Sequence, residues 1–255
     1  MKLRGILLAA ALAACATSSE VDTPPQPLQP TPAVDVAGNT LDELIGQGEE
    51  KFCWENDAWC VSASTASVPT FDRGAEITTF ESPDAQGYTA WRHGIVEADG
   101  SVIFGFVDTR TTMYSGGDAY ANQLTLYRAA PGAAPVQIAS LPFGGSARIR
   151  ACFSAEQAAA RLQSCQDEYF FNGRIELDTT NTDAAPRLIL QTEARTYPNR
   201  RSRDEDSTQA PPLTRADQTW WRDPECSYRI VLTRGADGQY RPERPLPACS
   251  DYLEL

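Results

Sequence analysis

The chain has 255 residues, a formal net charge of −12 at neutral pH and a single histidine. An acidic surface repels phosphate backbones, so nucleic acid is a poor candidate partner. One histidine and no C-x-x-C pair argue against a zinc or redox site, and phosphate-binding glycine motifs are absent, so we expect no metal and no cofactor.

The chain begins with a short targeting segment. Lys2 and Arg4 precede an uninterrupted apolar stretch, residues 5–14, that ends in small residues. This order is typical of a secretory signal peptide. The apolar stretch is too short to span about 30 Å of hydrocarbon as a helix, so we expect residues 1–14 to be cleaved off.

The segment Leu12-Ala13-Ala14-Cys15 resembles the lipobox of bacterial lipoprotein precursors. The resemblance implies cleavage before Cys15 and lipidation of its thiol and amine, so that the membrane becomes a partner through the lipid. Two or three acyl chains give stable anchoring. Because Ala16 rather than an aspartate follows the cysteine, the resemblance implies the outer membrane of a Gram-negative envelope, with the protein facing the periplasm.

Residues 15–38 are rich in proline and threonine and predict an extended spacer between the lipid and the folded part. Residues 39–255 are long enough to bury a core and predict one domain, although the length also allows two small ones. Within it, residues 198–218 mix prolines with adjacent charges of both signs, which indicates a flexible, solvated loop.

Six cysteines remain beside Cys15, and an even number in an exported chain indicates disulfides. Each neighbouring pair brackets a local signal: an Asn-Asp turn, a helix start at Ser154, or the hairpin dipeptide Asp237-Gly238. We therefore predict three sequential disulfides, Cys53 with Cys60, Cys152 with Cys165, and Cys226 with Cys249.

Period-two alternation and short apolar runs between turn dipeptides predict many strands. Asp99-Gly100, Asn172-Gly173 and Asp237-Gly238 predict hairpin turns. Capping boxes predict short helices at residues 41–45 and 155–162. The fold class expected is mainly β, an antiparallel sandwich or barrel-like fold with one or two short helices. The strand candidates are residues 88–97, 101–108, 123–128, 136–140, 168–171, 174–178, 187–192, 228–234 and 239–241.

Signals for catalysis are weak. His93 and Ser115 supply a base and a nucleophile, but Ser115 lacks the G-x-S-x-G elbow. Residues 178–183 supply oxygen ligands without the calcium-loop spacing. Paired carboxylates are sufficient for glycoside hydrolysis, yet among 34 acids some pair is always available. We assign no catalytic residue and do not expect an enzyme.

Trp220 and Trp221 are adjacent, so on a strand they point to opposite faces and one is expected to be exposed. An exposed tryptophan stacks on sugars or anchors a partner, which makes these two the candidate binding residues. The sequence thus predicts a lipid-anchored envelope protein that acts as a binding or structural module toward an envelope protein or glycan. The alternatives are an envelope glycoside hydrolase and an inhibitor of a lytic enzyme such as lysozyme.

Overall fold

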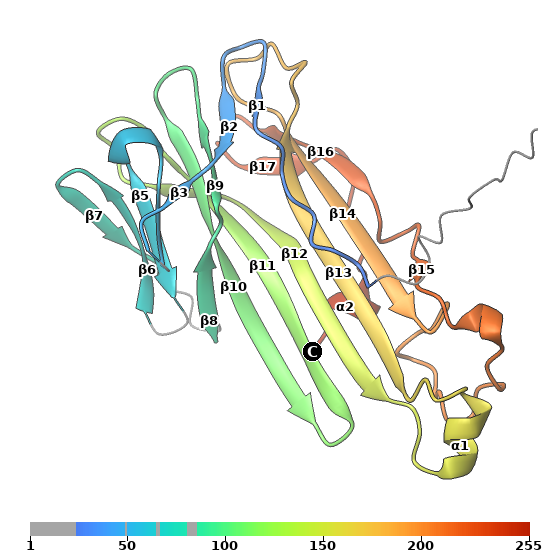
Figure 1. Ribbon diagram of the computed structural model, residues 1–255. Coiled ribbons are helices and arrows are strands. Elements are labelled where there is room, and N and C mark those ends of the chain that lie inside the picture. The colour runs from blue at the N-terminus through green and yellow to red at the C-terminus, as the bar shows by residue number, and fades with distance from the viewer. Residues whose placement is uncertain (1–23, 49, 65–66, 81–85) are drawn as a thin grey trace, which may run out of the picture.

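The computed structural model describes residues 24–48, 50–64, 67–80 and 86–255 (Figure 1). The leader, Cys15 and the first part of the spacer therefore lie outside the described residues. The described chain is mainly β, and its strands form two sheets in which every pairing is antiparallel. The expected fold class is confirmed.

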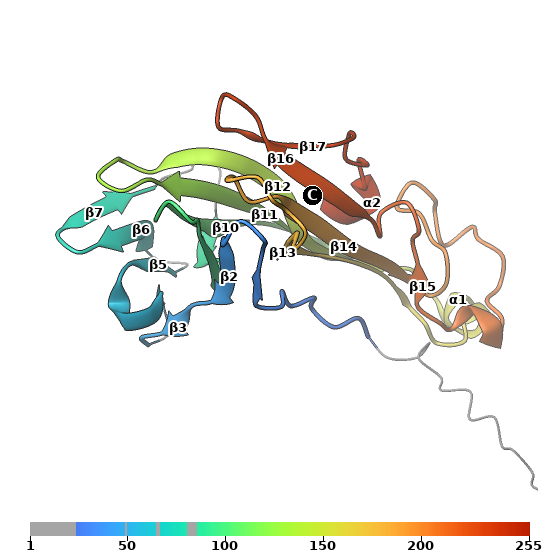
Figure 2. The ribbon, with the colours of Figure 1, turned by 90° about the horizontal axis from the view of Figure 1, so that it is seen from above.

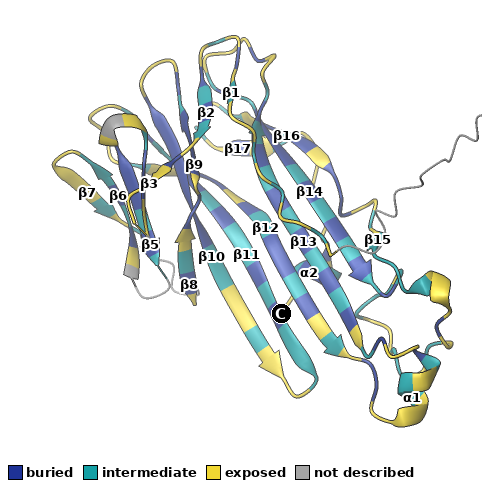
Figure 3. Ribbon diagram, in the orientation of Figure 1, coloured by how far each residue is buried: buried dark blue, intermediate teal, exposed yellow. Residues whose placement is uncertain are grey.

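The large sheet has twelve strands, of which β10 to β14 form the long central part (Figure 1). Strand β13 shows why these segments are strands: every second residue along it is buried, so one face supplies core residues (Figure 3). Ten of the strands follow one path, while β8 (Gly87–Ala90) pairs with β10 and β15 (Trp221–Arg222) pairs with β14. The path runs β1 (Ala33–Val34), β2 (Thr40–Glu43), β9 (His93–Val96), β10 (Val102–Tyr114), β11 (Gly117–Ala129), β12 (Val136–Arg150), β13 (Gln166–Leu177), β14 (Leu188–Tyr197), β16 (Arg229–Arg234) and β17 (Tyr240–Pro242).

The small sheet consists of β3 (Ile45–Gly46), β4 (Lys51–Cys53), β5 (Cys60–Ser64), β6 (Ser67–Arg73) and β7 (Glu76–Thr79). It packs on β8 to β11 through an aromatic cluster. The Phe71 and Phe104 rings stack across the interface with centroids 4.2 Å apart, and Trp59 lies beside both. Because Phe104 is fully buried, this contact fixes the small sheet to one end of the large one.

Helices are few and short: α1 (Ala155–Ala160), α2 (Ser250–Leu253) and the 3-10 turns η1 (Glu55–Asp57) and η2 (Arg215–Asp217). Helix α1 begins where the sequence predicts, with the Ser154 hydroxyl accepting the backbone N–H of Gln157. Tyr252 of α2 packs against Phe171 of β13. No helix in the described ranges is long and apolar enough to span a membrane.

Residues 24–30, which we call the strap, run along the large sheet before β1 (Figure 2). The Arg174 guanidinium of β13 donates a hydrogen bond to the Gln29 carbonyl at 3.2 Å. Phe171 packs against α2 whereas Arg174, three residues further along β13, binds the strap, since residues an odd number apart in a strand lie on opposite faces. The strap and α2 thus lie on opposite faces of the sheet (Figures 1 and 2).

All three predicted disulfides are present: Cys53 with Cys60, Cys152 with Cys165, and Cys226 with Cys249. Each joins segments that are close in sequence. The hairpins predicted at Asp99-Gly100 and Asp237-Gly238 are also confirmed, because β9 pairs with β10 and β16 with β17 across them.

Two local predictions are wrong. Residues 41–45 do not form a helix, because Leu41 lies in β2, is fully buried and pairs with Ile95 of β9. Tertiary pairing here overrides the capping-box pattern. Asn172-Gly173 is not a turn but the middle of β13, where Gly173 allows close packing against Phe143. The predicted strand 88–97 is divided into β8 and β9 by a break at Trp91 and Arg92.

Candidate functional site

A cavity of about 320 Å³ lies between the strap and the large sheet, and we call it the strap cavity. Aromatic, aliphatic and polar side chains line it together, as is usual for small-molecule sites, and its volume lies at the low end for such sites. Its walls are Pro27, Leu28, Gln29, Pro30, Thr89, Ala90, Trp91, Arg92, His93, Val107, Asn122, Phe143, Asn172 and Gly173.

Three buried polar atoms of the strap cavity have no hydrogen-bond partner among the described residues. They are Nε1 of Trp91, Oδ1 of Asn122 and Nδ2 of Asn172. Leaving such a group buried and unpaired costs about 1 to 3 kcal/mol, and native proteins rarely leave several in one place. Two donors and one acceptor, all buried and unpartnered in residues that line one cavity, are typical of a site for a polar ligand.

The sheet itself creates the space between the two asparagines. Asn122 of β11 and Asn172 of β13 both pair with Gly144 of β12, so the three residues form one row across three strands. A Cβ on residue 144 would lie 3.1 Å from Nδ2 of Asn122. Glycine at this position therefore keeps the row open between the two amides.

The cavity has no negative charge among its described lining residues. Its one charged lining residue is Arg92, whose guanidinium lies 5.0 Å from the centroid of the Phe52 ring. Burial lowers the pKa of His93 below its ordinary value, although Glu43 and Asp42 act in the opposite direction. At neutral pH the imidazole, whose ring lies 5.8 Å from that of Trp91, is therefore uncharged.

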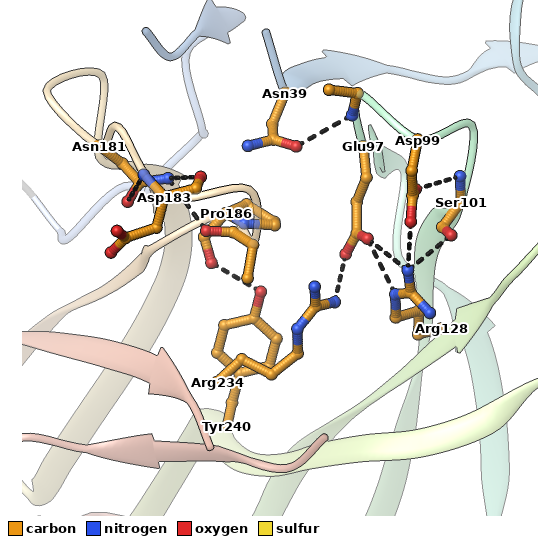
Figure 4. Close-up of polar contacts among 12 residues, drawn as sticks. Asn39, Glu97, Asp99, Ser101, Arg128, Asn181, Asp183, Pro186, Arg234 and Tyr240 are labelled. Atoms are coloured by element: carbon orange, nitrogen blue, oxygen red, sulfur yellow. Dashed lines mark hydrogen bonds and ion pairs between the residues drawn. The ribbon is translucent and has the colours of Figure 1, made fainter. Parts of the chain in front are cut away.

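A second polar cluster, which we call the clasp, joins distant parts of the chain (Figure 4). Its centre is the buried Glu97 carboxylate, which accepts hydrogen bonds from Arg128 at 2.9 Å and Arg234 at 2.5 Å. Arg128 also donates to Asp99 and Ser101. The members of the clasp are Asp35, Asn39, Glu97, Asp99, Ser101, Arg128, Asn181 and Arg234.

The other half of the clasp centres on Asp35, which accepts from the Asn39 and Asn181 amides at 2.8 and 3.0 Å. Burial raises the pKa of Asp35, but the hydrogen bonds from Asn181 and Asn39 outweigh this effect and hold the pKa below its ordinary value. The Asp35 carboxylate is thus ionised, and both Asp35 and Glu97 accept hydrogen bonds from within the clasp. This arrangement stabilises the fold and leaves neither acid free for proton transfer.

The predicted tryptophans lie at a different place. Trp221, in β15, is half-buried and lines a cleft of about 480 Å³ together with Glu205, Asp223, Glu225 and Asp251, which we call the Trp221 cleft. The guanidinium of Arg200 lies 5.2 Å from the Trp221 ring. Trp220, also half-buried, packs on Tyr197 with ring centroids 5.5 Å apart.

The weaker sequence signals are not brought together as sites. Strand β9, which contains His93, pairs with the beginning of β10, whereas Ser115 follows the end of β10. The two positions are roughly 40 Å apart along the strand. Asp178 binds Thr180 and Arg187, and Asn181 belongs to the clasp, so these oxygens are already engaged. In the described ranges, one group of residues lies close enough together to share a metal ion: Asp57 with Cys53 and Cys60. The two cysteines form a disulfide, so they offer no thiolate.

Sequence reasoning identified His93 but missed Trp91, Asn122 and Asn172. The available signal is composition: asparagine is depleted in strands, and both asparagines lie inside long ones. A half-buried strand asparagine with a buried, unpartnered amide atom needs a reason beyond backbone preference. Comparison with protein-family models, curated proteins and solved structures found no match in any of the three.

Proposed function

We propose that this protein is a lipid-anchored protein of the bacterial cell envelope that acts as a binding module through the strap cavity. The observation that supports it most directly is the group of three buried, unpartnered polar atoms of Trp91, Asn122 and Asn172. Three disulfides support an oxidising compartment outside the cytoplasm. The lipobox-like segment ending at Cys15 supports the anchor.

The anchor is tested by metabolic labelling with a fatty-acid analogue and separation of the membranes in a Gram-negative host. The wild-type protein is expected to take up label and to fractionate with the outer membrane, and Cys15→Ala to take up none. Ala16→Asp is the matched control, because it keeps the lipidated cysteine and should move the labelled protein to the inner membrane. Equal labelling of wild type and Cys15→Ala contradicts the anchor.

The binding role is tested by affinity capture from solubilised envelope, with the full-length protein immobilised in detergent. Wild type should retain an envelope protein or glycan that the double variant Asn122→Leu, Asn172→Leu does not retain. Both variants replace an amide with an apolar side chain of similar size, so the cavity loses its polar groups without being emptied. Identical material on both columns would contradict binding at this cavity.

The Trp221 cleft supports a second candidate function, carboxylate-dependent hydrolysis of a glycan, because one cleft gathers a tryptophan and several acids. Glu205 and Glu225 are exposed there, whereas Asp223 is held by the Tyr252 hydroxyl at 3.1 Å. The test is release of soluble sugar from isolated cell-wall material. Release by wild type that is lost in Glu205→Gln or Glu225→Gln would favour the hydrolase, and no release would exclude it.

A further inference from the structure

We propose that the strap cavity binds an uncharged acetamido sugar, in which one N-acetylated ring is held beneath the strap. This inference rests on the proposed binding function and adds the chemical class of the ligand. It follows from the donors and acceptors that line the cavity, from the charge of its walls and from its size.

The hydrogen-bonding groups of the cavity match those of an acetamido group with a neighbouring hydroxyl. Nε1 of Trp91 and Nδ2 of Asn172 are donors and need acceptor oxygens, while Oδ1 of Asn122 needs a donor. An acetamido carbonyl accepts, its N–H donates, and a ring hydroxyl supplies the second acceptor. One N-acetylated sugar ring therefore carries the two acceptors and the one donor that these three groups need.

The apolar walls suit the remaining parts of such a ligand. Phe143, Pro27 and Leu28 line the same cavity, and they can cover the acetyl methyl group and the C–H face of a sugar ring. Trp91 is only 3% exposed, so it offers a sugar no free ring face, and its unpartnered N–H is the group left to bind. The site thus recognises a mixed polar and apolar group from several sides.

The charge of the lining and the backbone geometry argue against two other ligand classes. With no acid among the described lining residues and an uncharged His93, the cavity has no counter-charge for a cationic ligand, and its one guanidinium, that of Arg92, lies over the Phe52 ring. The backbones of β11, β12 and β13 pair with one another at Asn122, Gly144 and Asn172. No free strand edge lies there for an extended peptide, which usually binds by strand addition.

The test is calorimetric titration of the full-length protein in detergent with chitotriose and with cellotriose. The two sugars share one backbone and differ in carrying acetamido groups or hydroxyls. Chitotriose is expected to bind at least about tenfold more tightly than cellotriose, since a site built to hydrogen-bond one group discriminates against its replacement. Equal affinities, or no heat from either sugar, would overturn the acetamido assignment.

Variants locate the binding. Asn122→Ala and Asn172→Ala should each weaken chitotriose binding about tenfold or more. Gln123→Ala should leave it unchanged, because Gln123 does not line the cavity. Circular dichroism and thermal midpoints establish that each variant is folded. An equal loss in all three variants would place the sugar elsewhere on the molecule.

A peptide with the strap sequence, residues 24–30, serves as the third probe. If it binds at the cavity while chitotriose does not, the ligand is a proline-rich peptide and the sugar assignment is wrong. If the capture experiment retains envelope material but chitotriose does not bind, the proposed binding function is supported and only the acetamido-sugar assignment is wrong. Failure of the capture experiment together with chitotriose binding would remove the envelope partner and keep the sugar site.

Discussion

The clasp and the strap cavity are two groups of buried polar side chains that use their hydrogen-bonding capacity differently. In the clasp every member has a partner within the protein, and the Glu97 carboxylate has two guanidinium partners (Figure 4). In the cavity three buried atoms have none among the described residues. A cluster whose hydrogen-bonding groups all have partners stabilises the fold. A cluster with unpartnered groups lowers stability, and such a cluster is typical of a binding site.

Glu97→Gln is expected to have the largest effect on stability. The substitution removes the negative charge between Arg128 and Arg234, whose side chains are 21% and 16% exposed. Removing one member of a buried ion pair leaves an uncompensated charge, so the free energy of unfolding should fall by about 3 kcal/mol. Denaturant unfolding measures this change.

The control for Glu97→Gln is Asp118→Asn, which breaks the exposed ion pair between Arg148 and Asp118. Exposed pairs contribute less than about 1 kcal/mol, so this control should change little. If both substitutions had equally small effects, the clasp would not be a stabilising element.

Asn181→Ala tests the other half of the clasp. Asn181 donates to the Asp35 carboxylate and to the carbonyls of Asp183 and Ala185. Without it these acceptors lose a partner in a buried place, and the free energy of unfolding should fall by about 2 kcal/mol. The same substitution at Asn172, whose buried amide nitrogen has no partner, should cost much less. Equal losses at positions 181 and 172 would remove the contrast between the two regions.

How far the sequence predicts this molecule depends on how local each interaction is. The disulfide pairs and the Asp99-Gly100 and Asp237-Gly238 hairpins join near neighbours, and short-range patterns identified them correctly. The Asp35 to Asn181 hydrogen bond spans 146 positions, and no local pattern predicts it. The strap cavity combines six strands, the segment between β8 and β9, and the strap, so its residues share no sequence signal.

Asn172→Leu should change the free energy of unfolding in the opposite direction to Asn181→Ala. Leucine removes an unpartnered buried amide and adds apolar surface to a cavity that Phe143 and Leu28 already line. We expect the free energy of unfolding to rise by up to about 1 kcal/mol while chitotriose binding is lost. Unfolding curves and titrations on the same sample measure both quantities. A clear loss of stability would indicate that Asn172 has a structural partner after all.

His93 gives the smallest effect and connects stability with binding. Because burial holds its pKa below the ordinary value, the unfolded chain takes up a proton at a higher pH than the folded one. The contribution of His93 is therefore fully present above about pH 6.5 and is lost as the pH falls from there through the lowered pKa. Acidification also adds the charge of His93 to a cavity wall that already carries the charge of Arg92, so chitotriose binding should weaken in the same range. His93 is the only histidine, so its ring signal in NMR reports the titration without overlap.

His93→Gln should flatten both the stability and the binding profile between about pH 7 and 5. An unchanged pH dependence in that variant would assign the effect to other groups, and the carboxylates of Glu43 and Asp42, which face His93, are the next to test.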